Sequence, residues 1–424
     1  MSGRYASALA AEIAPDLLSR FDRYVRVDTQ SVRDRTRSPS TPGQLELGRL
    51  LTDELREAGL TDAALDPNGY VTATLAANRD HAPVIGLIAH VDVSPDAPAG
   101  GVEPVVHRDY DGDVISLPRN GTRLDPASMP ELGAREGHDI VTSSGDTLLG
   151  ADDKAGVAEI VTAVAYLAAH PELPRPTLRV CFTPDEEIGE GATLFDIEGF
   201  GARCAYTLDG SGVGGVNDET FSADEVVATI RGVDIHPGYA TGKLVSALRV
   251  AAEIVAALPT DRLTPDTTSG REGFIHPYEL IGSAATAEIR AILRDFDENT
   301  LREHRELFEQ TARSVVRAHP GATLELEVRR QYRNMHEHLA PVPEVVAAAE
   351  EAIRAEGLEP ARRPIRGGTD GSRLSEMGLP TPNIFTGGHE YHSVREWASL
   401  QDMAAAAATI VRLAAVWATR TDGA

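Results

Sequence analysis

The sequence predicts an α/β domain that is interrupted by a smaller α+β domain. Helical and strand patterns alternate up to residue 218, which is typical of a sheet with helices on its faces. From 219 to 335 the order changes to strand, helix, strand, strand, helix, strand, as in a ferredoxin-like sandwich. From residue 336 the first pattern resumes. We therefore expect a discontinuous mixed-sheet domain, 1–218 and 336–424, with 219–335 inserted into it.

Apolar spacing and stop signals predict the elements of the first domain. Residues 44–59 have helical periodicity and end at a glycine, and residues 154–171 form a second helical run that a proline ends. Residues 93–148 are rich in Pro, Gly and Asp and predict a long loop with short strands. Strands are predicted at 69–76, 83–92, 177–183 and 204–209, and the strand at 83–92 is too apolar to have a solvated face.

The same criteria predict the helices and strands of the inserted domain and of the C-terminal part. In the insert we expect a strand followed by a turn at 224–238, helices at 242–259 and 297–320, a hairpin at 273–297 and a strand at 323–332. In the C-terminal part we expect helices at 343–356 and 399–418 and strands near 362–366 and 381–386. The first 20 residues predict an amphipathic helix and not a signal peptide.

The composition excludes several function classes. The formal net charge of −25 disfavours nucleic acid and anionic membranes as partners. No apolar run reaches about 18 residues, so no membrane span is expected. The two cysteines, Cys181 and Cys204, lie in apolar surroundings and predict buried thiols in a reducing cytoplasm.

Polar residues follow the predicted strands at five places, and ligands bind α/β sheets at the carboxyl ends of strands. Each residue alone is more simply a helix N-cap, an acidic turn or a surface histidine. All five places together predict one site at the rim of the sheet. The residues are His90 and Asp92; Asp152 and Asp153; Asp185, Glu186 and Glu187; Asp209; and His392.

These residue types predict a site for metal ions. Zinc binds histidine nitrogen and carboxylate oxygen, and two zinc ions about 3.5–4 Å apart require a bridging carboxylate. Two zinc ions with three carboxylate ligands and one hydroxide would be electrically neutral. A di-zinc site therefore suits this cluster of carboxylates.

Several local motifs do not support other functions. The stretches 336–340 and 389–393 resemble HExxH but lack its paired histidines. The stretch GSGVGG at 210–215 matches a dinucleotide fingerprint, but a polar and then strand-like segment follows, not a helix that could bind a pyrophosphate. We expect these glycines to let the chain leave the rim and cross to the inserted domain. No GxSxG or Cys–His signature is present.

Six motifs, in order along nearly the whole chain, resemble the M20 metallopeptidases, and most closely their tripeptide aminopeptidases. They are AHVD, LLGADDKAG, FTPDEEIG, TLDGSGVGG, IRGGTDGSRLSEMGLPTPNIFTGG and YHS. The resemblance implies two Zn²⁺ ions per subunit, for which Co²⁺ or Mn²⁺ could substitute. It implies Asp152 as the bridging ligand, and the full ligand set as His90, Asp152, Glu187, Asp209 and His392.

The resemblance also implies the catalytic residues Asp92, Glu186 and His236. Glu186 would be the general base, and Asp92 would support the ring of His90, because both face the same side of a strand. His236 lies in the inserted domain, which the resemblance makes a lid and dimerisation domain, so we expect a homodimer. The candidates for binding the carboxylate end of a substrate are Arg294, Arg366 and Thr369.

The function that the resemblance implies is removal of the N-terminal residue from tripeptides by a zinc-activated water. An M20 dipeptidase or a deacylase of N-acyl amino acids would share the metal centre and differ only in its substrate pocket. A metal-stabilised protein that binds peptides without cleaving them is a third reading. It is disfavoured because Glu186 is present although no metal requires it as a ligand.

Overall fold

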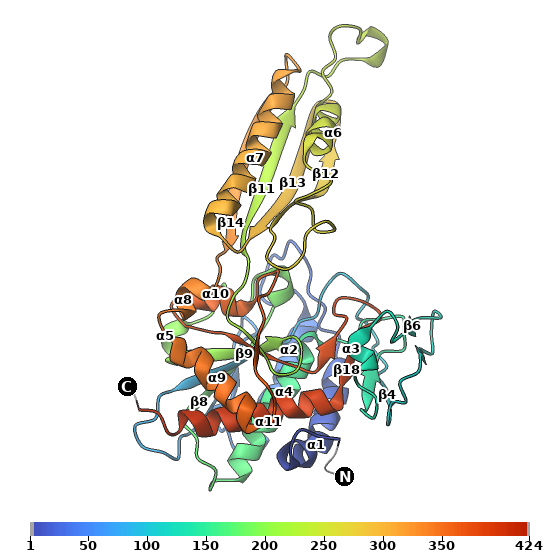
Figure 1. The fold of residues 1–424 in the computed structure, drawn as a ribbon. Helices are drawn as coiled ribbons and strands as arrows, with labels where there is room; N and C mark the ends of the chain where they lie inside the picture. Colours follow the sequence, from blue (N-terminus) through green and yellow to red (C-terminus); the bar gives the residue numbers. More distant parts are fainter. Residues whose placement is uncertain (1–3, 422–424) are drawn as a thin grey trace. The chain divides into compact units, whose positions relative to one another are not determined.

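The computed structural model describes residues 4–421, which belong to two compact units (Figure 1). Unit 1 holds the described residues up to Asp218, Glu337–Arg363 and those from Thr369 onward, and unit 2 holds Glu219–His336 and Pro364–Gly368. This division differs from the predicted one chiefly at 364–368. The short segment joins unit 2 because Ile365 forms a parallel bridge with Thr220.

Unit 1 is built on an eight-stranded mixed sheet, as predicted. Strands β3, β8, β9 and β16 run parallel, whereas β2 is antiparallel to β8 and β10 to β16. In sheet order the strands are β1 (Ala64–Leu65), β2 (Val71–Leu75), β8 (Leu178–Thr183), β3 (Ile85–His90), β9 (Cys204–Gly210), β16 (Asn383–Phe385), β10 (Gly215–Asn217) and β15 (Ala361–Arg362). The thiols of Cys181 and Cys204 are free and buried in this sheet, as predicted.

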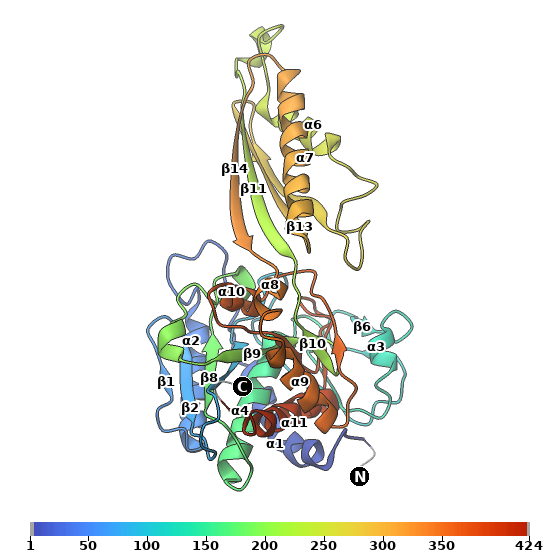
Figure 2. The same cartoon turned by 60° about the vertical axis from the view of Figure 1, so that its left-hand side comes forward.

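Helices pack on this sheet and on one another (Figure 2). Helix α4 packs against β3 and β9, and α2 packs against β2. Helix α11 is long and apolar enough to cross a membrane, but 89% of it is buried, as in the core helix of a globular domain. The helices of unit 1 are α1 (Ala8–Val25), α2 (Pro42–Glu57), α3 (Pro130–Gly133), α4 (Ala151–Ala169), α5 (Ile197–Phe200), α8 (His336–Leu339, beginning in unit 2), α9 (Pro343–Ala355), α10 (Asp370–Glu376) and α11 (Leu400–Trp417), with the 3₁₀ turn η1 (Glu186–Ile188).

A second sheet of unit 1 combines two strands of the segment predicted as a loop with two strands near residues 388–399. Its order is β17 (Gly388–His389), β18 (Trp397–Ser399), β7 (Ile140–Thr142) and β4 (Val105–His107). Strands β5 (Ile115–Ser116) and β6 (Arg123–Leu124) pair separately. The short strands were predicted, but their partners near residue 398 were not, because this pairing joins distant parts of the chain.

Unit 2 has the predicted ferredoxin-like topology. Its antiparallel sheet has the order β12 (Phe274–Gly282), β13 (Thr286–Asp295), β11 (Ser222–Arg231), β14 (Thr323–Tyr332). Helices α6 (Ala247–Ala257) and α7 (Glu298–Arg317) pack on it, and a 3₁₀ turn, η2, spans Pro237–Tyr239. Helix α7 buries Leu301, Phe308 and Ala312, which recur at helical spacing along one face. Helix α6 begins later than predicted because Val245 pairs with Val233.

Candidate active site

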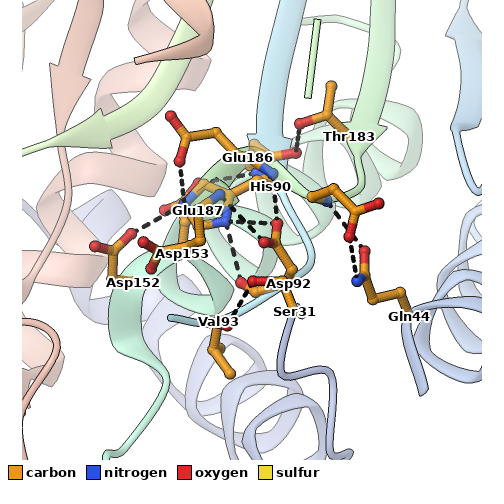
Figure 3. A network of polar contacts seen from close by, with 12 residues as sticks. Ser31, Gln44, His90, Asp92, Val93, Asp152, Asp153, Thr183, Glu186 and Glu187 are labelled. Carbon is orange, nitrogen blue, oxygen red and sulfur yellow. Dashed lines mark hydrogen bonds and ion pairs between the residues drawn. The ribbon is translucent and has the colours of Figure 1, made fainter. Parts of the chain in front are cut away.

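The candidate site lies at the carboxyl edge of the large sheet. Strands β3, β8, β9 and β16 are parallel, so the residues that end or follow them meet at one edge. His90 ends β3, Glu186 and Glu187 follow β8, and Asp209 lies one residue before the end of β9. Asp152 is in the first turn of α4, beside His90 (Figure 3).

Asp152 occupies the centre of the site and uses its two oxygens differently. Oδ1 lies 3.0 Å from Nε2 of His90, and Oδ2 lies 3.2 Å from Nε2 of His392. A carboxylate that presents one oxygen to each of two histidines has the arrangement required to bridge two ions.

Two groups of potential ligand atoms share Asp152. The first group is His90, Asp152 and Asp209, and the second is Asp152, Glu187 and His392. Within each group the ligand atoms lie within 4.8 Å of one another. In the second group Nε2 of His392 is 3.0 Å from Oε2 of Glu187, and in the first Nε2 of His90 is 4.0 Å from Oδ1 of Asp209. All five predicted ligands are therefore brought together, and their roles as ligands stay predictions.

Burial and mutual repulsion shift the pKa values of most carboxyl groups in the cluster upward. Burial, with the neighbouring charge of Asp152, raises the pKa of Glu187 to about 7. Burial also raises the pKa values of Glu186 and Asp209 well above their usual range. Burial would raise the pKa of Asp152 too, but hydrogen bonds with His392 and His90 hold it below its usual value. The carboxylates at the rim therefore resist being ionised together unless cations offset their charge.

The donor set fits metal ions. Oε1 of Glu187 is buried and has no hydrogen-bond partner within residues 4–421, although its Oε2 contacts His392. An unpaired buried carboxylate oxygen is costly, and a cation would satisfy it. Histidine nitrogen with carboxylate oxygen suits zinc and other divalent transition metals.

Asp92 holds the surrounding structure and belongs to neither ligand group. It is fully buried, and its Oδ1 and Oδ2 accept the backbone N–H groups of Glu186 (2.9 Å) and Glu187 (3.2 Å). Nδ1 of His90 lies 3.1 Å from the carbonyl oxygen of Asp92 and 3.4 Å from its Oδ1. These contacts favour a proton on Nδ1 and leave Nε2 free to bind a metal. The predicted contact between His90 and Asp92 is present, although Asp92 lies two residues beyond the end of β3; the catalytic role of Asp92 stays a prediction.

The carboxylates after β8 lie on an irregular turn, as their adjacency required. Asp185 has a positive φ of 59°, Glu186–Ile188 form one 3₁₀ turn, and Gly189 has a φ of 76°. The turn directs Glu187 to the second ligand group and leaves Glu186 outside both groups. Oε2 of Glu186 lies 4.0 Å from Nε2 of His90.

Sequence reasoning missed Glu396, and it placed Asp153 at the rim without giving it a role. Glu396 is buried, and its carboxylate accepts the backbone N–H groups of Leu149 (2.7 Å), Gly150 (2.8 Å) and Asp152 (3.0 Å). Asp153 is buried as well, and its Oδ2 accepts the N–H of His90 at 3.2 Å. Glu396 fixes the backbone of the bridging residue. The local signal for Glu396 was a charged residue directly before Trp397, a large apolar side chain.

Unit 2 contains three of the other predicted site residues. His236 is exposed, and its Nδ1 accepts the N–H of Gly238 at 3.1 Å, which places the proton of the neutral ring on Nε2. Arg294 lies on β13, and its Nε is buried with no hydrogen-bond partner among the described residues. An unpaired donor suits the predicted binding of a carboxylate, and this role of Arg294 stays a prediction.

Arg366 and Thr369 have contacts that point away from their predicted substrate role. Arg366 donates to the carbonyl oxygens of Gly270 (3.1 Å) and Glu272 (2.9 Å) and to Oγ1 of Thr268 (2.9 Å). Its guanidinium is therefore committed to holding the 268–272 loop. Thr369, in unit 1, is buried, and its hydroxyl lies 3.2 Å from Oδ1 of Asn383. These contacts favour structural roles, because a substrate would have to displace bonds that the fold already uses.

Three solved structures resemble the chain in fold. The aminopeptidase PepT of Bacillus cereus has a TM-score of 0.74 at 24% identity, over 96% of this chain and 99% of that one. A tripeptidase of Staphylococcus aureus has a TM-score of 0.73 at 21% identity, over 96% and 99%. The YXEP protein of Bacillus subtilis, described as a dinuclear metal-binding peptidase from the M20 family, has a TM-score of 0.63 at 15% identity, over 96% and 98%.

Sequence comparison gives the family. The model of Peptidase family M20/M25/M40 matches residues 148–416. The Peptidase T of Bacillus velezensis is 44% identical over 407 residues, which are 96% of this chain and 99% of that protein. The Peptidase T of Geobacillus kaustophilus is 44% identical over 400 residues, which are 94% and 97%. The chain therefore belongs to the peptidase family M20/M25/M40.

Proposed function

We propose that the protein is a zinc-dependent aminopeptidase that removes the N-terminal residue from tripeptides. The observation that carries the proposal is Asp152, whose two oxygens face His90 and His392 in two ligand groups that share it. The near-full-length relatives named Peptidase T support the reaction, and the M20 family supports the use of metal.

Five residues would hold the ions, and Zn²⁺ suits them best, with Co²⁺ or Mn²⁺ as substitutes. When bound, the ions would supply a water of lowered pKa and positive charge at the reacting carbonyl group. The first ion would take His90 and Asp209, the second would take Glu187 and His392, and Asp152 would bridge them.

Glu186 is proposed as the general base. Its carboxylate is outside both ligand groups, so it stays free to move a proton. Burial, with the charges of Asp209 and other carboxylates, raises its pKa above the usual range, which suits a group that takes a proton from water and returns it to the leaving amine. Asp92 fixes the backbone N–H of Glu186 and the ring of His90.

Peptide contacts and assembly are part of the proposal. His236 and Arg294 are proposed to contact the scissile carbonyl oxygen and the C-terminal carboxylate of the peptide. A homodimer is supported by exposed apolar side chains on unit 2, among them Leu248 on α6 and Ile281 on β12. A cytoplasmic location suits the buried free thiols.

The test is to incubate the purified protein with a panel of peptides, with and without a chelator, and to identify the products. We expect release of one N-terminal residue from tripeptides, loss of activity with chelator and recovery with Zn²⁺. Cleavage of dipeptides or N-acetyl amino acids in preference to tripeptides would assign another M20 activity. Binding of peptides without products would contradict the proposal.

Two variants test the assigned roles. Glu186→Gln should retain both ions and lose turnover, because it removes the base and no ligand. Asp152→Ala should lose metal and turnover together, because the bridge serves both ions. Near wild-type hydrolysis by Glu186→Gln would show that another group moves the proton.

A further inference from the structure

Asp185, the first carboxylate of the turn after β8, belongs to neither ligand group. Its side chain is 0% exposed, and its backbone has the left-handed φ of 59°. Burying an ionised carboxylate costs free energy unless donors surround it, and a left-handed non-glycine residue is maintained only where neighbours hold it. The partners of Asp185 therefore indicate what this arrangement serves.

The donors come from the segment that leads into α2. Oδ2 of Asp185 accepts the N–H of Ser40 at 2.8 Å, and Oδ1 accepts the Ser40 hydroxyl at 2.5 Å and the Gln44 amide at 2.7 Å. The Oε1 of Gln44 in turn accepts the backbone N–H of Asp185 at 3.1 Å. Gln44, also 0% exposed, thus holds both the side chain and the backbone of Asp185. Figure 3 shows Gln44 facing the turn from the opposite side to Asp152.

Hydrogen bonds to neighbouring residues of unit 1 also fix the backbone of the rest of the turn. Asp92 accepts the N–H groups of Glu186 and Glu187, and the carbonyl oxygen of Asp185 accepts the N–H of Glu190 at 2.9 Å. The backbone on each side of Glu186 is therefore fixed, while its carboxylate is outside both ligand groups.

We propose that Asp185, held by Ser40 and Gln44, is a positioning residue for Glu186. It fixes the backbone from which the general base projects and so sets the distance of that base from the reacting water. This inference rests on the proposed role of Glu186. It is independent of metal binding, because the side chain of Asp185 contacts no residue of either ligand group. Its remaining partner within residues 4–421 is Arg35, at 3.5 Å.

The test is a pair of complementary substitutions. Asp185→Asn replaces one acceptor oxygen with an NH₂ group that opposes the donors of Ser40 and Gln44. We expect kcat to fall about tenfold or more, because small misplacements of a catalytic group are costly. KM should stay within about twofold, since ground-state binding is unchanged. The content of bound metal, measured by mass spectrometry, should match that of the wild type.

Gln44→Glu places a second carboxylate against Asp185 and should also lower kcat. In the double variant Gln44→Glu/Asp185→Asn, the carboxylate introduced at position 44 can accept both the side-chain amide and the backbone N–H of position 185. The pairing is restored with donor and acceptor exchanged, so most of kcat should return. A merely structural loss of the turn would lower metal content and thermal stability without this rescue of kcat.

The control is Glu190→Gln. Glu190 directly follows the turn and forms a 2.7 Å ion pair with Arg35, which this substitution weakens. The bonds of Ser40 and Gln44 to Asp185 stay intact, so kcat should stay near the wild-type value. If Asp185→Asn does not fold, Ser40→Ala removes a single hydroxyl donor and should give a smaller fall in kcat with full metal content.

Three results would overturn the inference: wild-type kcat in folded Asp185→Asn, loss of metal in proportion to activity, or a double variant no more active than Asp185→Asn. Glu186→Gln is measured in parallel. Wild-type turnover by Glu186→Gln would overturn the proposed base itself, whereas an inactive Glu186→Gln beside a fully active Asp185→Asn would overturn only the positioning role.

Discussion

Glu159, on α4 two turns after Asp152, should lower the stability of unit 1 at neutral pH. It is 0% exposed, and neither of its carboxylate oxygens has a hydrogen-bond partner in residues 4–421. Burial raises its pKa well above the usual value; the nearby N–H of Gly387 offsets this in part, and the charge of Asp402 adds to it. In the unfolded chain a glutamate has a pKa of about 4.3. At a pH between the two pKa values, the folded protein must therefore keep a proton that the unfolded chain releases.

The sign follows from linkage. The pKa of Glu159 is higher in the folded state than in the unfolded state. The stability that the protonated acid contributes to folding is therefore fully present below the unfolded-state pKa, and it is lost as the pH rises towards the folded-state pKa. Within that window the loss is at most about 1.4 kcal/mol per pH unit. Glu159→Gln has no proton to keep, so its free energy of unfolding should exceed that of the wild type by an amount that grows with pH.

The assay is urea unfolding of the metal-free proteins between pH 5 and pH 8. Tryptophan fluorescence reports on unit 1 alone, because the two tryptophans of the chain, Trp397 and Trp417, both lie there. Glu57→Gln is the control, because Glu57 is exposed on α2 and should show no pH-dependent difference. A constant difference between Glu159→Gln and the wild type across this range would refute the reasoning.

Three further predictions concern the site and unit 2. Glu396→Gln should weaken metal binding in equilibrium dialysis, because it disturbs the three N–H bonds that fix Asp152; Glu356→Gln, a buried glutamate paired elsewhere, should not. Arg294→Met should raise KM about tenfold or more for a tripeptide but not for its C-terminal amide, if Arg294 binds the carboxylate; equal effects on both would exclude that role. Arg366→Ala should speed hydrogen exchange at residues 268–272 and leave metal content unchanged, whereas unchanged exchange would mean that its four hydrogen bonds do not hold the loop.

The elements that position the site were predictable because they depend on local patterns. Apolar runs predicted the buried strands β3, β8 and β9, and the parallel arrangement of an α/β sheet brings their carboxyl ends together. The ferredoxin-like order of unit 2 was predictable for the same reason. Motif resemblance then assigned ligands within these strand ends.

The features that were missed depend on contacts between distant parts of the chain. Strand β18 pairs with β7 across more than half the sequence, and Glu396 binds backbone groups 244–247 residues away. Neither contact has a periodicity or a local motif. The contacts of Arg366 were also not predictable, because only the structure shows the carbonyl oxygens that its guanidinium binds; its substrate role stays a prediction.

Three consecutive carboxylates, Asp185, Glu186 and Glu187, can follow one buried strand because the turn separates their surroundings. Asp185 is directed into the donors of Ser40 and Gln44, where its charge is matched within the protein. Glu187 is directed to His392, and burial and the charge of Asp152 still raise its pKa to about 7. Only the first of the three is fully satisfied by the fold. The remaining repulsion is confined to the two residues that face the ligand groups, which is where bound cations would remove it.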